Sequence, residues 1–292
     1  MLRQLLLNGI IAGGIYSLIA LSFTIIYRTV KFFHFAHGVV YTGGAYLAYT
    51  FAISLGFPFL LSFFLATVLA AILGLCIDRL VYSPLRQKKA TNLVLLIASF
   101  GIFIFIQNLI QLIYGAQILT LRTGPIREGY QIFSAVITPI QVMILVVSVA
   151  LMLALWLFIQ KTKMGKAMRA VADDPVGASV VGIYPEHTIL TAFAIGSAAA
   201  GIAGILISLE TNIEPTMGFS AILKGMIASI IGGIGSIPGA MFGGFFLGIV
   251  ENLGIWKIQA GWKDTIAFAV LIVFLLFRPG GIFNVKAGPE RV

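Results

Sequence analysis

Residues 5–26 read LLLNGIIAGGIYSLIALSFTII, an apolar run without a charged side chain. A helix needs about 20 such residues to cross the hydrocarbon core of a lipid bilayer. The run is longer than the apolar core of a signal peptide, roughly 7–15 residues, and no small-residue cleavage motif follows it. We therefore expect a first membrane-spanning helix that the protein retains.

The composition of the whole chain indicates that lipid is its main solvent. Hydrophobic residues make up 60% of the 292 and charged residues only 10%, and the mean hydropathy is +1.05. A soluble domain carries about 25% charged residues. The net charge of +9 is spread between apolar runs, so nucleic-acid binding, which needs clustered positive charge, is not expected.

Further apolar runs follow the first, and lipid favours helices in all of them because a helix satisfies its own backbone hydrogen bonds. We predict an all-α integral membrane protein, a polytopic bundle of about eight or nine transmembrane helices, as one domain over residues 1–292. The expected spans are 5–26, 35–54, 58–77, 92–114, 139–159, 188–209, one or two within 219–254, and 264–277.

Residues 219–254 decide between the two helix counts. As one helix they would extend about 54 Å, against a hydrocarbon core of about 30 Å. The glycines and the proline of GGIGSIPGA, residues 232–240, are expected to break the helix. Two short spans give nine helices and a cytoplasmic C-terminus with Arg278, Lys286 and Arg291, the alternative we favour; one span with a re-entrant piece gives eight.

Lysine and arginine residues are concentrated in every second connection between the apolar runs, and this distribution predicts the orientation of the chain in the membrane. Three alternate connections hold ten basic residues, and the segments between them hold three. Basic loops stay in the cytoplasm, which places the N-terminus outside. The cytoplasmic set is Arg28, Lys31, Arg79, Arg86, Lys88, Lys89, Lys161, Lys163, Lys166 and Arg169, and the outer set is Arg3, Arg122 and Arg127.

Glycines recur at helical spacing in two parts of the chain. Gly9 and Gly13 form a small-xxx-small pair, and Gly235, Gly239 and Gly243 form a ladder. This spacing lets helices approach closely in lipid. It predicts close packing inside one bundle, with a gating or dimer surface as the alternative.

The sequence contains no convincing catalytic or metal-binding set. One cysteine and three histidines are too few for a nucleophile with its base or for a metal cluster, and no Walker A motif is present. We expect no enzymatic activity, no metal and no cofactor in this chain.

His34 and His37 stand in FFHFAHG, at the start of the second run. Three residues apart, they are expected to share a helix face, where they could bind a metal or relay protons. The alternative is that they form hydrogen bonds at the membrane interface, among the neighbouring phenylalanines.

Acidic residues are scarce in the later runs. Glu210 and Glu214 fall at the predicted outer end of the sixth run, either as solvated charges or as docking groups for basic residues of an external partner. Glu251 lies in or near the later spans, as do Lys224 and Asn252. An ionisable side chain at membrane depth is a candidate functional residue. A buried carboxylate cluster of the kind that an ion-coupled carrier needs is not predicted.

Residues 164–183, MGKAMRAVADDPVGASVVGI, are compatible with water and lie in the predicted cytoplasm. Their apolar and charged side chains separate onto two helix faces, with Arg169 and Asp173 as a pair one turn apart. Asp174 is expected to cap a second short helix that begins at the following proline and ends at Gly182. The small side chains favour contact with another protein over the alternative, a helix lying on the membrane surface.

Three blocks of the chain resemble ABC importer permeases of the branched-chain amino acid (LivH/LivM) family. GKAMRAVADDPVGASVVGI is similar to the cytoplasmic coupling segment of that family, and KGMIASIIGGIGSIPGAMFGGFFLGIVENLG to its glycine-rich late block. HFAHGVVYTGGAYLAY resembles its N-F-A-H-G block, with His34 where asparagine is usual. The resemblance extends over nearly the whole chain and is closer to the LivH type than to the longer LivM type.

The resemblance implies a permease subunit of an ATP-driven importer in a bacterial or archaeal cytoplasmic membrane, for branched-chain or related small aliphatic amino acids. It also implies two cytoplasmic ABC ATPase subunits, a second permease subunit (a LivM-like chain or a second copy) and an external solute-binding protein. Coupling to the ATPase is carried over to the segment 161–187, at Gly165, Ala167, Arg169, Ala170, Asp173, Ala178 and Gly182. A pathway or gating role is hypothesised for His34, His37, Gly38, Gly235 and Gly239.

Two alternatives to this function stay open. Within the family, urea, short amides or other small carboxylates are alternative substrates. Outside it, a self-contained channel or secondary carrier would transport without any ATPase.

Overall fold

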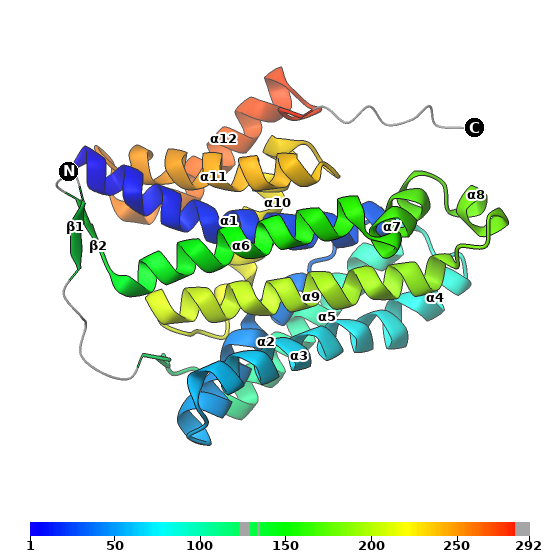
Figure 1. Ribbon diagram of the computed structural model, residues 1–292, viewed down its shortest axis with the longest axis horizontal. Coiled ribbons are helices and arrows are strands. Elements are labelled where there is room, and N and C mark those ends of the chain that lie inside the picture. Colours follow the sequence, from blue (N-terminus) through cyan, green and yellow to red (C-terminus); the bar gives the residue numbers. More distant parts are fainter. Residues whose placement is uncertain (123–128, 133–134, 284–292) are drawn as a thin grey trace. The chain divides into compact units, whose positions relative to one another are not determined.

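The computed structural model describes residues 1–122, 129–132 and 135–283, and helices make up most of this part of the chain (Figure 1). Arg127, Lys286 and Arg291, which entered the predicted orientation, lie outside the described residues. The helices are α1 (Leu2–Val30), α2 (His37–Tyr49), α3 (Phe59–Ile77), α4 (Ser83–Gln87), α5 (Asn92–Tyr114), α6 (Pro139–Lys161), α7 (Lys163–Asp173), α8 (Pro175–Val180), α9 (Pro185–Glu210), α10 (Met217–Gly232), α11 (Ile237–Gly254) and α12 (Lys263–Phe277).

Six helices in the described part of the chain are long and apolar enough to cross a membrane. This confirms an all-α membrane protein, whereas the predicted number of eight or nine spans stays a prediction. The six are Leu2–Val30, Phe59–Gln87, Asn92–Tyr114, Pro139–Lys161, Pro185–Glu210 and Ile237–Gly254, and Met217–Gly232 is a shorter apolar helix.

The predicted break inside residues 219–254 is confirmed. α10 ends at Gly232 and α11 begins at Ile237, with Ser236 as its cap: the Ser236 hydroxyl accepts a hydrogen bond from the Gly239 N–H at 3.1 Å. Between the helices, Gly233 and Gly235 have φ angles of +109° and +85°, which side chains with a Cβ rarely adopt.

The sequence did not predict the irregular elements. A π-helical turn at Thr50–Ser54 follows α2, and another at Asp78–Tyr82 joins α3 to α4. Two short strands, β1 (Tyr130–Ile132) and β2 (Ala135–Ile137), pair antiparallel outside the apolar runs.

The chain divides into two compact units. The first comprises Met1–Thr24, Gly124–Trp156 and Leu223–Val292, and the second comprises Ile25–Thr123 and Leu157–Ile222. The boundaries fall inside α1, α6 and α10, so each of these helices contributes residues to both units.

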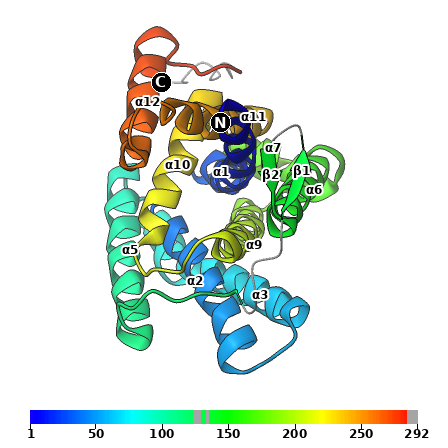
Figure 2. The same cartoon turned by 90° about the vertical axis from the view of Figure 1, so that its left-hand side faces the viewer.

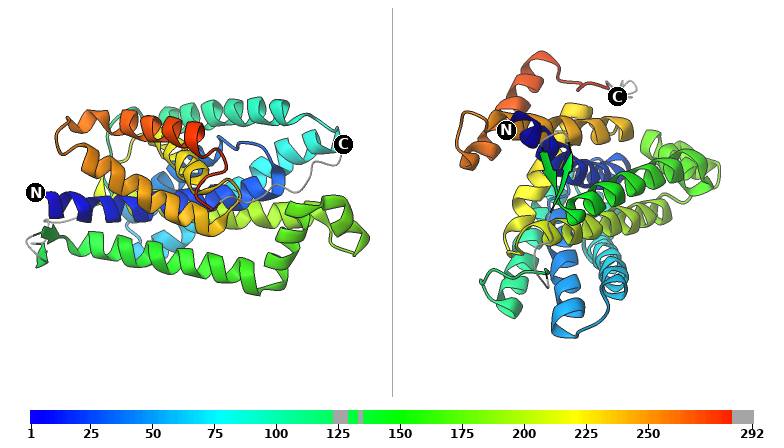
Figure 3. Two further views of the ribbon diagram at one scale, coloured as in Figure 1. Left: turned by 90° about the horizontal axis from the view of Figure 1, so that it is seen from above. Right: turned by 60° about the vertical axis from the view of Figure 1, so that its left-hand side comes forward.

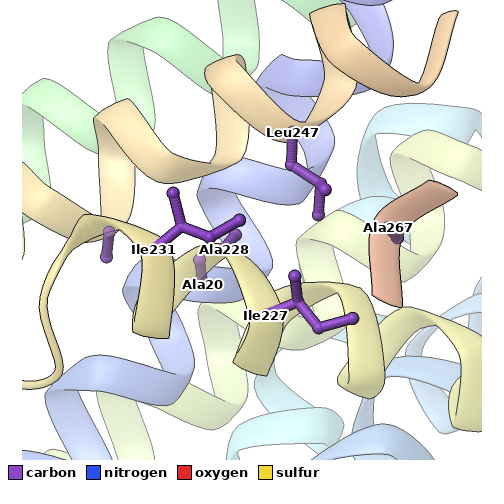
Figure 4. Packing of buried hydrophobic residues seen from close by; sticks show 7 residues of the cluster. Ala20, Ile227, Ala228, Ile231, Leu247 and Ala267 are labelled. Atoms are coloured by element: carbon purple, nitrogen blue, oxygen red, sulfur yellow. The ribbon is translucent and has the colours of Figure 1, made fainter. Parts of the chain in front are cut away.

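In the first unit, an apolar cluster joins α1, α10, α11 and α12 (Figure 4). α11 and α12 lie side by side (Figure 2). Close approach of α1 to α11 depends on glycine: a Cβ on Gly248 would collide with the backbone of Gly13, as the small-xxx-small spacing predicts. The buried cluster consists of Ala20, Ile227, Ala228, Ile231, Ala240, Leu247 and Ala267.

In the second unit, α2, α3 and α9 pack against one another (Figure 2). Gly44 of α2 faces Gly201 of α9, and a Cβ built on either residue would overlap its neighbours. One turn further along α9, a Cβ on Gly204 would run into the backbone carbonyl of Tyr41. The three helices therefore meet at backbone distance.

Replacing Gly204 by alanine is expected to destabilise this helix triplet. The added methyl group has to displace α2, and overpacking of a dense interior costs typically about 1–3 kcal/mol. Gly101→Ala in α5 is the matched control, because a Cβ there meets nothing within 4 Å and alanine favours the helix. Denaturant unfolding of the purified chain in micelles measures both; equal effects at the two positions would contradict the packing argument.

Candidate functional site

A pair of short helices between α6 and α9 occupies the predicted coupling segment (Figures 1 and 3). α7 begins after Thr162, whose hydroxyl accepts a hydrogen bond from the Gly165 N–H at 3.0 Å. α8 begins after Asp174, whose Oδ1 accepts from the N–H groups of Val176 and Gly177, each at 3.0 Å. The predicted cap at Asp174 is confirmed.

The end of α8 follows the prediction as well. Gly182 has a φ of +85°, its N–H donates to the Ser179 carbonyl at 3.1 Å, and the Ile183 N–H donates to the Ala178 carbonyl at 3.0 Å. These two bonds form the Schellman arrangement that ends helices at glycine.

The inner side of this helix pair is packed against its own unit. A Cβ on Gly165 would overlap the backbone of Phe158 and Ile159 at the end of α6, and the Ala178 side chain is buried. Of the predicted coupling residues, these two thus fix the shape of the segment. Ala167, Arg169 and Ala170 are partly exposed, and Asp173 and Gly182 are exposed.

The predicted ion pair between Arg169 and Asp173 is wrong. Arg169 Nη1 donates to Gln160 Oε1 at 2.5 Å, and Asp173 Oδ1 lies 3.7 Å from Arg28 Nη2 instead. Thr162 separates α6 from α7, and Arg169 of α7 reaches back to Gln160 in the last turn of α6, a partner that spacing within one helix does not reveal.

Removing the cap by Asp174→Ala is expected to loosen α8, since the loss of an N-cap costs about 0.5–2 kcal/mol. Hydrogen exchange of the amides of Val176 and Gly177 measures the effect. Asp173→Ala is the neighbouring control, because Asp173 caps nothing and its exposed ion pair contributes at most about 1 kcal/mol. Unchanged exchange in the Asp174 variant would show that the cap does not order the turn.

A second charged cluster, which the sequence did not predict, lies where α4 meets the start of α9. Arg86 donates to the buried Asp78 at 2.6 Å and to Glu186 at 2.8 Å, and Ser83 donates to Glu186 at 3.2 Å. A cavity of about 210 Å³ lies beside it. A carboxylate at the end of a long apolar run was the available signal.

His34 and His37 do not share a helix face, because α2 begins only at His37. Both rings are completely buried, with their centroids 5.7 Å apart. His34 Nδ1 is 2.9 Å from the Tyr82 hydroxyl, and the Ala36 N–H donates to Ser99 Oγ at 3.1 Å. The hydrogen-bond contact of His34 agrees with that part of the predicted alternative, whereas a position at the membrane interface stays a prediction.

In the first unit, four residues form a largely buried polar cluster. Lys224 Nζ lies 3.3 Å from Glu251 Oε2 and 3.0 Å from Asp264 Oδ1, and the Tyr16 hydroxyl donates to Glu251 Oε2 at 2.9 Å. Glu251 is fully buried, whereas Asp264 is exposed. The sequence singled out Glu251 and Lys224 but not the other two.

Two connections meet at the far end of α9. An isolated antiparallel bridge pairs Leu119 with Ile213, and the Arg122 guanidinium donates to the Glu210 carbonyl. Glu214 is exposed in the same connection. Within residues 1–122, 129–132 and 135–283, no three histidine, cysteine or acidic side chains are grouped as metal ligands.

These features define a multi-pass helical membrane protein that carries a capped pair of short helices outside its apolar runs. Residues 5–275 match the family model described as branched-chain amino acid transport system / permease component. The chain therefore belongs to this permease family, and the resemblance seen in its sequence is confirmed.

Curated relatives and a solved structure agree with this assignment. The high-affinity branched-chain amino acid transport system permease protein LivH of Escherichia coli K12 is 39% identical, covering 96% of this chain and 95% of LivH. BraD of Pseudomonas aeruginosa, with the same description, is 38% identical at the same coverage. A structure of PsaBC from Streptococcus pneumoniae in complex with Fab shares the fold, with a TM-score of 0.54 at 14% identity over 95% of this chain and 92% of that chain.

Proposed function

We propose that this chain is the membrane-spanning permease subunit of an ATP-driven importer of branched-chain amino acids. The observation that carries the proposal is the family match over residues 5–275, together with relatives of the same length that transport these amino acids. In this proposal residues 1–292 form one permease domain, and the segment 161–187 transmits the motion of separate ATPase subunits.

The ion pairs of the second unit support the proposed orientation. Arg28 of the first predicted cytoplasmic connection pairs with Asp173 of the third, and Arg86 of the second pairs with Glu186 near the end of the third. The connections that the distribution of basic residues assigns to one side of the membrane thus contact one another. At the other end of α9, Arg122 and the Glu210 carbonyl join two predicted outer connections. We propose nine spans, an outer N-terminus and a cytoplasmic α7–α8 pair.

The outward side of the α7–α8 pair is the proposed contact with the ATPase. It exposes the apolar residues Val176, Val180, Val181 and Tyr184, while Gly165 and Ala178 anchor the inner side. Exposed apolar side chains on a polar segment are typical of a protein contact. A rigid pair that is anchored on α6 and contacts α9 could pass closure of two ATPase subunits on to the spans.

The remaining roles follow from the same proposal. A second permease subunit, LivM-like or a second copy, would complete the pathway, and an external binding protein would deliver the substrate near Glu210 and Glu214. Burial of His34, His37 and Gly38 supports an effect on helix position rather than contact with substrate. Gly235 and Gly239, at the break between α10 and α11, are proposed to permit movement there.

Transport by the reconstituted complex tests the proposal. The liposomes hold this chain, the second permease subunit and the ATPase, and binding protein is added on the membrane side opposite the ATPase. They are expected to transport leucine only when ATP is present on the side of the membrane that carries the ATPase. Uptake by the purified chain alone would instead indicate a self-contained channel or carrier. If the complex took up urea or acetamide but not leucine, the substrate would be urea or a short amide rather than a branched-chain amino acid.

A further inference from the structure

An open cleft of about 680 Å³ lies in the second unit, between α5 and the connection from α9 to α10. Its volume falls in the range of roughly 300–1,000 Å³ that is typical of small-molecule sites. Both elements belong to the same compact unit. Glu214, proposed above as a docking group for the binding protein, is among its lining residues.

One wall of the cleft is aromatic. Phe103 stacks on Phe100 of the same helix, with centroids 6.2 Å apart, and its ring lies 5.8 Å from that of Phe219 in the first turn of α10. Phe100 and Phe219 are each about 40% exposed, at 40% and 41%. This wall offers an aliphatic side chain an apolar surface without ordering any long, flexible group.

The rest of the cleft lining is largely polar and carries one charge. Gln107, Asn212 and Glu214 belong to it, and the Glu214 carboxylate forms no ion pair with any described residue. No lysine or arginine is among the lining residues. A bound ammonium group would therefore find a counter-charge, whereas a carboxylate would find only neutral donors.

From this arrangement we infer that the cleft binds a zwitterionic amino acid with an aliphatic side chain. The side chain lies against Phe100, Phe103 and Phe219, the ammonium group pairs with Glu214, and the carboxylate accepts hydrogen bonds from Gln107 and Asn212. The inference rests on the proposed function and adds a substrate site on the permease itself, separate from selection by the binding protein.

Three probes separate the contacts of the two charged groups. Tritiated leucine is bound to the assembled permease–ATPase complex in nanodiscs without binding protein, and is competed with 3-methylbutylamine, which lacks the carboxylate, or with 4-methylpentanoate, which lacks the ammonium group. Glu214→Gln is expected to weaken leucine and 3-methylbutylamine about tenfold each, as for loss of a charged hydrogen bond, and to leave 4-methylpentanoate within about twofold. An equal loss for all three probes, or none, overturns the inference.

Two further variants control for indirect effects. Glu210→Gln neutralises an acid at the end of α9 and outside the cleft lining. Because this assay contains no binding protein, the variant is expected to leave all three affinities unchanged. Phe219→Ala shortens the exposed aromatic wall and is expected to weaken leucine binding several-fold while leaving alanine binding unchanged. Equal losses for leucine and alanine would argue that the wall does not contact the side chain.

The inference and the proposed function fail in different ways. Photo-leucine, a diazirine amino acid, is expected to label residues 100–107 and 211–220 in the wild-type complex, and excess leucine is expected to suppress the labelling. ATP-driven leucine uptake together with labelling confined to other segments would reject the cleft and retain the importer. Absence of any leucine uptake by the complete system would reject the proposed function itself.

Discussion

Replacing Val180 by aspartate is expected to abolish ATP-driven leucine uptake while the chain still inserts into the membrane. Val180 is 82% exposed on α8, beside Val176 and Val181 at 73% each and Tyr184 at 74%. The substitution therefore removes no packing inside the chain. In an apolar contact with the ATPase it would bury an unpaired carboxylate, which costs several kcal/mol, and each 1.4 kcal/mol corresponds to a factor of ten in affinity.

Two measurements separate docking from folding in this variant. Co-purification of the ATPase with the permease is expected to fall about tenfold or more, while membrane abundance and thermal stability stay at wild-type values. Leu55→Asp is the matched control, since Leu55 is also exposed, at 55%, but lies in a predicted outer connection. Wild-type uptake in the Val180 variant would show that α8 is only a surface helix.

Local chemistry made the ends of short elements predictable from the sequence. Asp174 could be assigned as a cap because its carboxylate needs only the amides two and three residues later. The break between α10 and α11 could be placed because glycine and proline act within a single turn. Both predictions depend on interactions between residues that are only a few positions apart in the sequence.

Partners that are distant in sequence could not be predicted from spacing. Asp173 was assigned to Arg169, one helical turn away, but its partner is Arg28 of another connection. Asp78 and Glu186 share Arg86, although nothing in the local pattern of either acid indicates the other. Such pairs depend on how α1, α4, α7 and α9 meet.

The cleft between α5 and the connection from α9 to α10 could not be predicted from local sequence either. Glu214 was recognised as an unusual acid, but Phe100 and Phe103, which line the same cleft, come from α5, far away in the sequence. Phe100 and Phe103 read only as members of a uniform apolar run, since spacing alone does not separate a lipid-facing phenylalanine from one that lines a cleft.

Replacing Lys224 by methionine is expected to produce the largest loss of stability among these variants. Lys224 is 14% exposed and lies 3.3 Å from Glu251, which is 0% exposed. Without the lysine, the Glu251 carboxylate remains buried with the Tyr16 hydroxyl as its hydrogen-bond donor. Removal of one partner from a buried pair typically costs about 3–5 kcal/mol, because the remaining charge is uncompensated.

A second substitution tests that explanation within the same cluster. Glu251→Gln removes the charge and keeps an oxygen that can accept from Tyr16, so the double variant Lys224→Met with Glu251→Gln is expected to recover at least about half of the loss. Lys257→Met is the control, since Lys257 is exposed, and is expected to change stability by less than about 0.5 kcal/mol. Unfolding of each purified variant in mixed micelles measures the free energies. If the double variant were as unstable as Lys224→Met alone, the loss would come from the packing of the lysine stem rather than from an unpaired carboxylate.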